Sequence, residues 1–283
     1  MGNYTSRSQL GVAQNIWAVG DMKEIELNGM VSRYEEYPVS VYILGFNHNP
    51  DYEEAGITFG LAKSDLENQI DICLIDDYYD LEPESSFNVA YSIKHLVTYT
   101  NGGWKGSDIR YDILGSTNIQ PKNYSTSRYT DVEGYDPVDY DIINSPIPDT
   151  LLAAFPEELR AVMKPNIKYT NNLPEGHNVI SASVDYLWLL SEYEIFGSIT
   201  NTSPLEAEKQ AQYQYYIDGN SAIKFTDISW HSESIWWTRS STPSFESGSK
   251  VILSQSWCCV GESGETTTAT PNYSYGLAPA FLV

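Results

Sequence analysis

The chain has 283 residues, with 38 acidic side chains against 16 basic ones and a formal net charge of −22. Nucleic acid and anionic membrane surfaces both bind clusters of Lys and Arg, and no basic stripe is present, so both are excluded as partners. No run approaches the roughly 18 apolar residues that cross a bilayer, so we expect no membrane insertion.

Aromatic residues are unusually frequent, because the chain contains 22 tyrosines and aromatics reach 13%. Tyr and Trp are enriched in recognition surfaces, where they give rigid contact area at low entropic cost. Strands also favour aromatic residues. Composition alone therefore leaves a recognition surface and a β-rich fold equally open.

The N-terminal part of the chain predicts short strands. Residues 1–16 are polar and lack a core pattern, so we expect an N-terminal anchor or arm. The segment KEIELNG at 23–29 alternates polar and apolar residues before an Asn-Gly turn, and VSVYILGF at 39–46 is a β-branched and aromatic run. Both patterns are typical of strands.

Residues 47–145 are rich in turn formers, with apolar pieces such as IDICLI at 70–75 and DIRYDIL at 108–114. That much irregular chain argues against a regular sandwich or a doubly wound sheet. We therefore predict an α+β fold with short strands, few helices and long structured loops. The prediction is a single domain over 17–283, with a loose internal boundary near 146.

Acidic clusters in this region allow two kinds of site. The segment DVEGYDPVDYD turns repeatedly, and hard cations need several carboxylate oxygens, so it is a candidate Ca²⁺ site formed by Asp131, Glu133, Asp136, Asp139 and Asp141. A carboxylate pair for glycoside hydrolysis is also open, using Asp76–Glu84 or the calcium cluster. Solvated acidic loops are commoner than either site in a chain of this charge.

The next segment predicts short helices and a strand. Residues 148–163 show helical spacing on either side of Pro156, IKYT at 167–170 is typical of a strand, and SVDYLWLLS at 183–191 of a buried segment. Ser191 and Glu194 have capping-box spacing, and we expect a helix within 204–217.

Catalytic motifs are missing from the sequence. The four histidines are scattered, no G-x-S-x-G elbow or phosphate loop is present, and the three cysteines lack C-x-x-C spacing. We therefore predict no catalytic residues, and no cofactor apart from the candidate calcium. Cys258 and Cys259 would point to opposite faces of a strand, which predicts one core thiol and one exposed thiol without a disulfide between them.

The last fifty residues carry WWTRSS at 236–241 and KVILSQSWCCV at 250–260. At least one of Trp236 and Trp237 should be a core aromatic. Arg239 would then bind backbone carbonyls, a role that Lys could not fill. An inward-facing set that includes Trp257 and Val260 requires a β-bulge near Trp257.

These residues resemble a family of uncharacterised domains in Firmicutes and their phages. The resemblance rests on WWTRSS, CCVGESG and SYGLAPAFLV, and it extends upstream through blocks such as WAVGDMKEIELNG, VYILGFNHN and SVDYLWLLSEYEIFG. That family is similar to the C-type-lectin-like fold of formylglycine-generating-type proteins and of the variable adhesins of diversity-generating retroelements. In such adhesins a fixed scaffold displays changeable residues that bind a receptor.

The resemblance divides the C-terminal region, about 230–275, into scaffold and display positions. The scaffold positions are Trp236, Trp237, Arg239, Ser240, Cys258, Val260, Gly264, Tyr275, Gly276, Pro279 and Phe281. The display positions are Thr238, Ser241, Thr242, Pro243, Ser244, Phe245, Cys259, Gly261, Glu262 and the run from Glu265 to Tyr273, which includes Thr267 and Asn272.

The resemblance implies a bacteriophage virion protein, at the tail tip or on the capsid surface, that binds a bacterial surface glycan or protein. Other virion proteins would be its further partners, and adhesins of this kind are often homo-oligomers, including trimers. One alternative is a structural or decoration protein that uses the same face for subunit contacts. A second is a glycan-degrading enzyme that uses the acidic loops. Fold alone does not choose among them.

Overall fold

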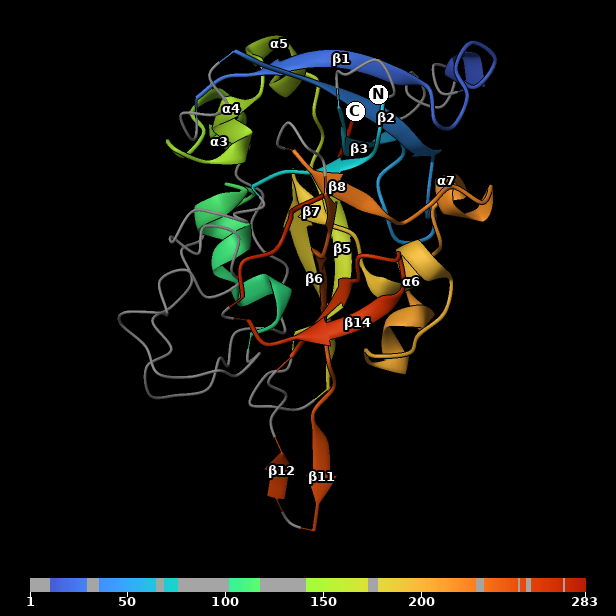
Figure 1. Ribbon diagram of the computed structural model, residues 1–283, viewed down its shortest axis with the longest axis vertical. Helices are drawn as coiled ribbons and strands as arrows, with labels where there is room; N and C mark the ends of the chain where they lie inside the picture. The colour runs from blue at the N-terminus through green and yellow to red at the C-terminus, as the bar shows by residue number, and fades with distance from the viewer. Residues whose placement is uncertain are drawn as a thin grey trace.

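The computed structural model describes residues 11–29, 36–64, 69–75, 102–117, 141–172, 178–227, 232–248, 250–252, 256–271 and 273–283. Its architecture is mixed α+β, with most strands in several small antiparallel sheets (Figure 1). The largest sheet is antiparallel and joins both ends of the chain. Its strands, in order, are β1 (Met22–Leu27), β2 (Tyr37–Phe46), β3 (Ile57–Ser64), β15 (Pro279–Leu282) and β7 (Trp188–Leu189).

The smaller sheets carry the C-terminal region and its support. One antiparallel sheet contains β10 (Trp236–Ser241), β13 (Trp257–Val260) and β14 (Thr266–Ala269), and β5 (Asn166–Asn171) pairs with β6 (Ile180–Asp185). The strands β11 (Phe245–Ser247) and β12 (Lys250–Ile252) form a hairpin. A further sheet holds β4 (Ile72–Cys73), β8 (Lys224–Thr226) and β9 (Glu233–Ser234), with β4 and β8 parallel.

The described helices are all short. The α-helices are α3 (Asp141–Asn144), α4 (Leu151–Ala154), α5 (Glu157–Arg160), α6 (Glu192–Phe196) and α7 (Gln214–Ile217). The 3₁₀ segments are η2 (Trp104–Gly106) and η5 (Pro204–Glu208), and η3 (Ile109–Ile113) is a π-helical turn. In the described part of the chain, no helix has the length and apolar character needed to cross a membrane.

The hydrophobic core draws on the whole described chain, from Leu27 to Leu282. Trp104, Trp188, Trp236 and Trp237 are completely buried in it. Buried aromatic side chains of this size account for much of the apolar area removed from water on folding. The core therefore contains segments from both sides of residue 146.

Most of the predicted elements are confirmed. Strands cover 22–27 and 37–46, two short helices flank Pro156, and β5 contains the IKYT strand. The capping box forms as predicted: the Glu194 amide donates to the Ser191 hydroxyl, and the Glu194 carboxylate accepts from the Ser191 amide, both at 3.0 Å.

The helix predicted within 204–217 is confirmed only in part, because this stretch divides into η5 and the short α-helix α7. Between them, the Gln210 side-chain amide donates to the Tyr169 carbonyl at 2.6 Å. The Tyr213 backbone amide donates to the Glu194 carbonyl at 3.0 Å. These tertiary bonds hold the connecting residues outside helical geometry, so packing overrides helix propensity here.

The predicted β-bulge lies in the expected sheet but on the other strand. Trp237 pairs with Cys259, and Ser241 with Trp257, so β10 has two more residues than β13 in this interval. β13 keeps a continuous register with β14. The irregularity in β10 lets the Arg239 amide bond the Leu190 carbonyl at 2.9 Å, outside its own sheet.

Candidate functional site

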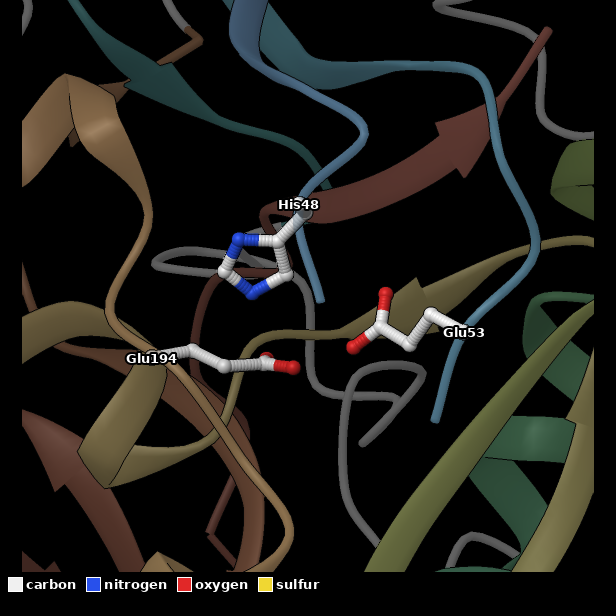
Figure 2. Close-up of side chains that lie close together, drawn as sticks. All are labelled: His48, Glu53 and Glu194. Carbon is white, nitrogen blue, oxygen red and sulfur yellow. The ribbon is translucent and has the colours of Figure 1, made fainter. Parts of the chain in front are cut away.

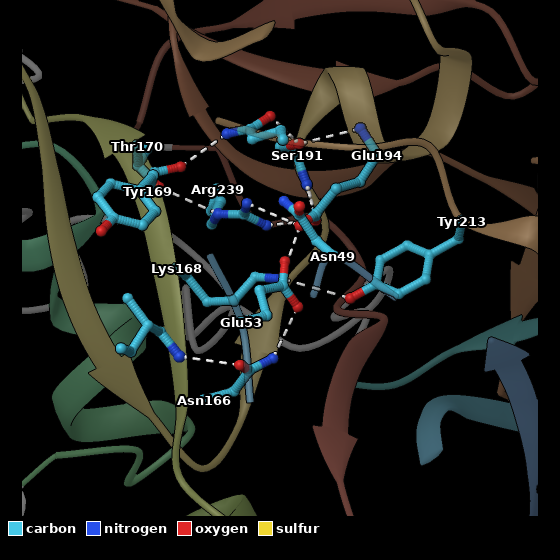
Figure 3. A network of polar contacts seen from close by, with 12 residues as sticks. Asn49, Glu53, Asn166, Lys168, Tyr169, Thr170, Ser191, Glu194, Tyr213 and Arg239 are labelled. Carbon is cyan, nitrogen blue, oxygen red and sulfur yellow. Dashed lines mark hydrogen bonds and ion pairs between the residues drawn. The ribbon is translucent and has the colours of Figure 1, made fainter. Parts of the chain in front are cut away.

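The C-terminal sheet is built on a completely buried arginine on β10. The Arg239 guanidinium donates to both carboxylate oxygens of Glu194, at 2.5 and 2.9 Å, and also to the Leu189 carbonyl at 2.9 Å (Figure 3). Its Nε donates to the Thr170 hydroxyl at 3.0 Å. The planar fork of Arg suits this set of acceptors. The predicted bond from Arg239 to a backbone carbonyl is confirmed, and Glu194 is an additional partner.

A buried lysine extends this network towards β2 and β5. The Lys168 ammonium lies 2.7 Å from Glu194 and 2.8 Å from Glu53. The Asn166 amide donates to the other Glu53 oxygen at 2.9 Å (Figure 3). Two cations therefore face two carboxylates, and the buried charges compensate one another.

His48 completes a group that has the composition of a metal site. The ligand atoms of His48, Glu53 and Glu194 lie within 4.8 Å of one another (Figure 2). An imidazole and two carboxylates suit Zn²⁺ or Mn²⁺. However, the Lys168 ammonium already contacts both carboxylates, so a divalent cation would have to displace it. The group fits an ion-pair network better than a metal centre.

The electrostatics of the group follow from burial and charge. Burial raises the pKa of Glu194, but the nearby Arg239 and Lys168 charges overcome it and hold the pKa well below the usual carboxyl range. Burial lowers the pKa of His48, whose ring stacks on Tyr213 with centroids 3.6 Å apart. The carboxylate is thus charged and the imidazole neutral near pH 7.

Two more buried carboxylates tie loops to the same sheet. Glu192 accepts from the backbone amides of residues 200–202 and from the Thr266 hydroxyl on β14 at 2.7 Å. Glu206 accepts from the Ser240 hydroxyl at 2.6 Å and from the Asn171 amide at 2.9 Å. We call Glu53, Lys168, Glu192, Glu194, Glu206 and Arg239 the polar frame.

The polar frame is suited to holding structure rather than to reacting. Each of its charged groups has hydrogen-bond or ion-pair partners within the frame or in the adjacent loops. The buried thiols are also poorly reactive, because burial raises the pKa of Cys258 strongly and that of Cys259 to about 12.

Several predicted display residues are not on the surface, so that part of the prediction is wrong. Thr238, Ser241, Ser244 and Cys259 are buried, Thr242 and Pro243 are half-buried, and Gly261 is buried. Both faces of β10 are covered, so its small polar side chains bond inward: the Thr238 hydroxyl donates to the Cys258 carbonyl at 2.8 Å, and the Ser241 hydroxyl to the Asn171 carbonyl at 3.1 Å. Alternation in a strand exposes every second residue only when one face is open.

The cysteine prediction is corrected in the same way. Cys258 and Cys259 are both buried free thiols, so the expected exposed thiol does not exist. Their lack of a disulfide is as predicted. Trp236, Trp237, Arg239, Cys258 and Pro279 are buried, as scaffold positions should be.

Steric constraints explain why glycine occupies two of the scaffold positions. A Cβ on Gly276 would lie 2.1 Å from the Cys73 sulfur, so only Gly allows this close approach. Gly264 has a φ of +83° in the turn between β13 and β14, where Gly is favoured.

Other predicted display residues are on the surface. Phe245 is 62% exposed and Tyr273 54%, and Glu262 and Glu265 are exposed in the turn after β13. Ile252, opposite Phe245 in the hairpin, is also exposed. Thr267 is half-buried, and Asn272 lies outside the described residues. We call Phe245, Ile252, Glu262, Glu265 and Tyr273 the display surface.

The β11–β12 hairpin projects from the molecule at the end opposite to β1 and the C-terminus (Figure 1). Its base is held by Asn178, which donates to the Ser244 carbonyl at 2.8 Å and accepts from the Ser244 amide at 3.1 Å. Asn171 in turn donates to the Asn178 side chain at 3.0 Å. The hairpin thus stands on a base fixed by side-chain hydrogen bonds.

The candidate calcium residues fall mostly outside the described chain. Asp131, Glu133, Asp136 and Asp139 lie there, and Asp141 is an exposed residue that begins α3. The acidic stretch Asp76–Glu84 also lies outside it. The calcium site and the carboxylate pair in these loops therefore stay predictions.

Most residues of the polar frame carry no recognisable sequence motif. Glu194 was visible through its capping box, but Lys168, Glu53 and Glu192 carried no motif. Lys168 is a single lysine in a strand, NIKYTN, and it is buried while its neighbours Ile167 and Tyr169 are half-buried. Such a residue is recognisable only when its burial is known.

A comparison with protein-family models matches residues 74–283 to one family. The upstream blocks before residue 74 lie outside that match. Neither the curated proteins nor the solved structures yield a match to this chain. Since the family match covers most of the chain, including the polar residues Lys168 to Arg239 and the whole display surface, the chain belongs to the family described as a domain of unknown function, DUF6273.

Proposed function

We propose that this protein is an adhesin of a phage virion, which attaches to a bacterial surface receptor through its display surface. The observation that carries the proposal is the projecting β11–β12 hairpin, on which Phe245 and Ile252 lie opposite each other and expose apolar side chains. Exposed aromatic and aliphatic side chains on a rigid support are typical of binding hot spots.

The arrangement of the molecule supports binding at one end. The hairpin and the strands β1 and β2 lie at opposite ends of the molecule (Figure 1). A protein attached to a particle through the β1 end would hold its hairpin away from the particle. The virion setting itself rests on the resemblance of the C-terminal motifs to phage domains.

We further propose that the domain has a C-type-lectin-like fold. The support is the buried WWTRSS strand, the buried arginine and the C-terminal strand that pairs with β3 in the terminal sheet. In that fold, changeable residues lie on a fixed frame, and the polar frame described above fills this role. The homo-oligomer, including a trimer, belongs to the same proposal.

A decoration protein is the second candidate, because an exposed apolar pair also suits contact with a neighbouring virion subunit. The two functions differ in their target. An adhesin binds intact bacteria as an isolated protein, whereas a decoration protein binds purified virions and leaves bacteria free.

The test uses fluorescently labelled full-length protein on a panel of intact Firmicutes cells. We expect saturable binding to one or more strains, and Phe245→Ala should reduce affinity at least about tenfold, since hot-spot truncation costs about 2 kcal/mol. Val162→Ala is the matched control, because Val162 is an exposed aliphatic residue outside the display surface. Equal loss in both variants, or binding to virions only, would contradict the proposal.

A further inference from the structure

Tyr273 of the display surface stacks on a second tyrosine, Tyr275. The rings of Tyr273 and Tyr275 lie 5.7 Å apart between centroids, with an angle of 6° between their planes. Tyr273 is 54% exposed, while Tyr275 is half-buried behind it. The pair therefore offers an aromatic side chain to solvent whose inner partner belongs to the fold.

The support behind the pair is rigid. The Tyr275 ring contacts the buried Trp237 ring, with centroids 4.9 Å apart. The neighbouring residue Gly276 bonds to the residues on either side of Trp236: its carbonyl accepts from the Trp237 amide at 2.9 Å and its amide donates to the Ile235 carbonyl at 3.0 Å. An aromatic platform fixed in this way loses little entropy on binding a ligand.

An acidic turn follows β13 next to the platform, because Cys259 of β13 pairs with Trp237, whose ring contacts Tyr275. The Gly261 amide donates to the Glu265 carbonyl at 2.8 Å, which closes the turn that carries the exposed Glu262. Burial raises the pKa of Tyr275, and the nearby Cys259, Tyr273 and Glu262 raise it further. Negative charge thus borders the aromatic side chains, and the net charge of the whole chain is −22.

We propose that Tyr273, Tyr275 and Glu262 form a binding site for an uncharged saccharide. A sugar ring has an apolar face that packs on an exposed tyrosine, and its hydroxyls donate to a carboxylate. Phosphate-bearing or acidic wall polymers are repelled by the acidic turn. The inference rests on the proposed function, because it names the class of receptor that the same surface recognises.

A protein receptor is the competing occupant. The acidic turn repels a protein less strongly than it repels a polyanion. The geometry favours the sugar because the platform presents one aromatic side chain, which matches a single sugar ring. A protein interface would require an apolar core of several buried side chains. Protein binding without glycan binding is therefore an outcome that overturns the inference.

The test begins with the full-length protein on an array of uncharged and anionic glycans, followed by calorimetry with the strongest oligosaccharide. We expect binding to uncharged glycans and none to poly(glycerol phosphate). Tyr273→Ala should weaken that binding about tenfold, the equivalent of about 1.4 kcal/mol, and Tyr273→Phe should keep it. Tyr52→Ala is the matched control, because Tyr52 is an exposed tyrosine on another part of the chain.

Two results would overturn the inference: no uncharged glycan binds, or Tyr273→Ala binds as tightly as the wild type. Strong binding of the anionic polymer through Tyr273 would also contradict it. Failure here is distinguishable from failure of the adhesin proposal. If labelled protein binds cells, Phe245→Ala abolishes that binding and oligosaccharides do not compete, the adhesin stands and the saccharide does not.

Discussion

At the scale of single residues, Arg239 determines how the C-terminal region is built. It is completely buried and joins β10 to Glu194 of α6, to the Leu189 carbonyl of β7 and to Thr170 of β5. One side chain therefore links four elements that are distant in sequence. Arg239 stabilises the fold because it places several donors correctly at once, since a buried ion pair by itself adds little net stability.

We expect Arg239→Lys to destabilise the protein by about 3 kcal/mol, because an ammonium cannot reach all of these acceptors and Glu194 would lose its paired contact. Urea unfolding followed by tryptophan fluorescence measures the change. Lys23→Arg, an exchange at an exposed position on β1, should leave the unfolding midpoint unchanged. An Arg239→Lys variant as stable as the wild type would show that the frame is not held by this residue.

His48 predicts a dependence of stability on pH. The pKa of His48 is lowered in the folded protein. Below about pH 6.5 the imidazole is therefore protonated in the unfolded chain while it stays neutral in the folded chain. Stability is therefore fully present above that pH and is lost as pH falls towards the lowered pKa. Glu194 acts in the same direction at lower pH, whereas the raised pKa of Glu206 opposes it.

The variant His48→Gln isolates this contribution. We expect the wild type to lose about 1 kcal/mol more stability than the variant between pH 7.5 and pH 5.5. Urea midpoints at the two pH values measure it, and the charges shared by both proteins cancel in the comparison. Parallel pH profiles would mean that the imidazole is not kept neutral by its surroundings.

At the scale of elements, the β11–β12 hairpin is separate from the hydrophobic core. The described side chains of β11 are all exposed, and none of the hairpin side chains that the structure describes belongs to the core cluster. Its base is instead fixed by Asn178 and by the Thr242 amide, which donates to the Ser256 carbonyl at 3.0 Å. Stability and binding should therefore be separable here.

Replacing residues 245–252 by a short Gly-Ser turn should leave the thermal unfolding midpoint within about 2 °C of the wild type, because the described side chains of this segment are exposed. Differential scanning calorimetry checks this. As a comparison, replacing the buried strand β13 should prevent folding. A large fall in the midpoint for the hairpin variant would show that the hairpin belongs to the fold.

The sequence predicts local elements better than it predicts the site. The strands 22–27 and 37–46 and the capping box at Ser191 are visible because periodicity and capping act over short distances. The burial of Thr238 and Ser241 was not visible, since it depends on β5 and β7 covering the outer face of β10. Serine and threonine at these positions resemble a polar surface until their inward hydrogen bonds are known.

At the scale of the whole molecule, the polar frame holds the interior together, and the display surface is exposed to solvent. The frame joins β5, α6, β10 and the loop between β2 and β3 through charges that compensate one another, so the interior is fixed. The surface is acidic overall, which keeps neighbouring copies soluble and disfavours polyanionic targets. If the protein is the proposed adhesin, substitutions on the display surface should change binding without disturbing the frame.

The central claim is that the hairpin end of the molecule binds bacteria. The most direct measurement compares the wild type with the protein lacking residues 245–252, as labelled proteins on the same intact Firmicutes cells, after calorimetry has shown that both are folded. We expect the wild type to bind saturably and the folded hairpin variant to lose at least about 90% of the bound signal. Undiminished binding by the folded variant would contradict it.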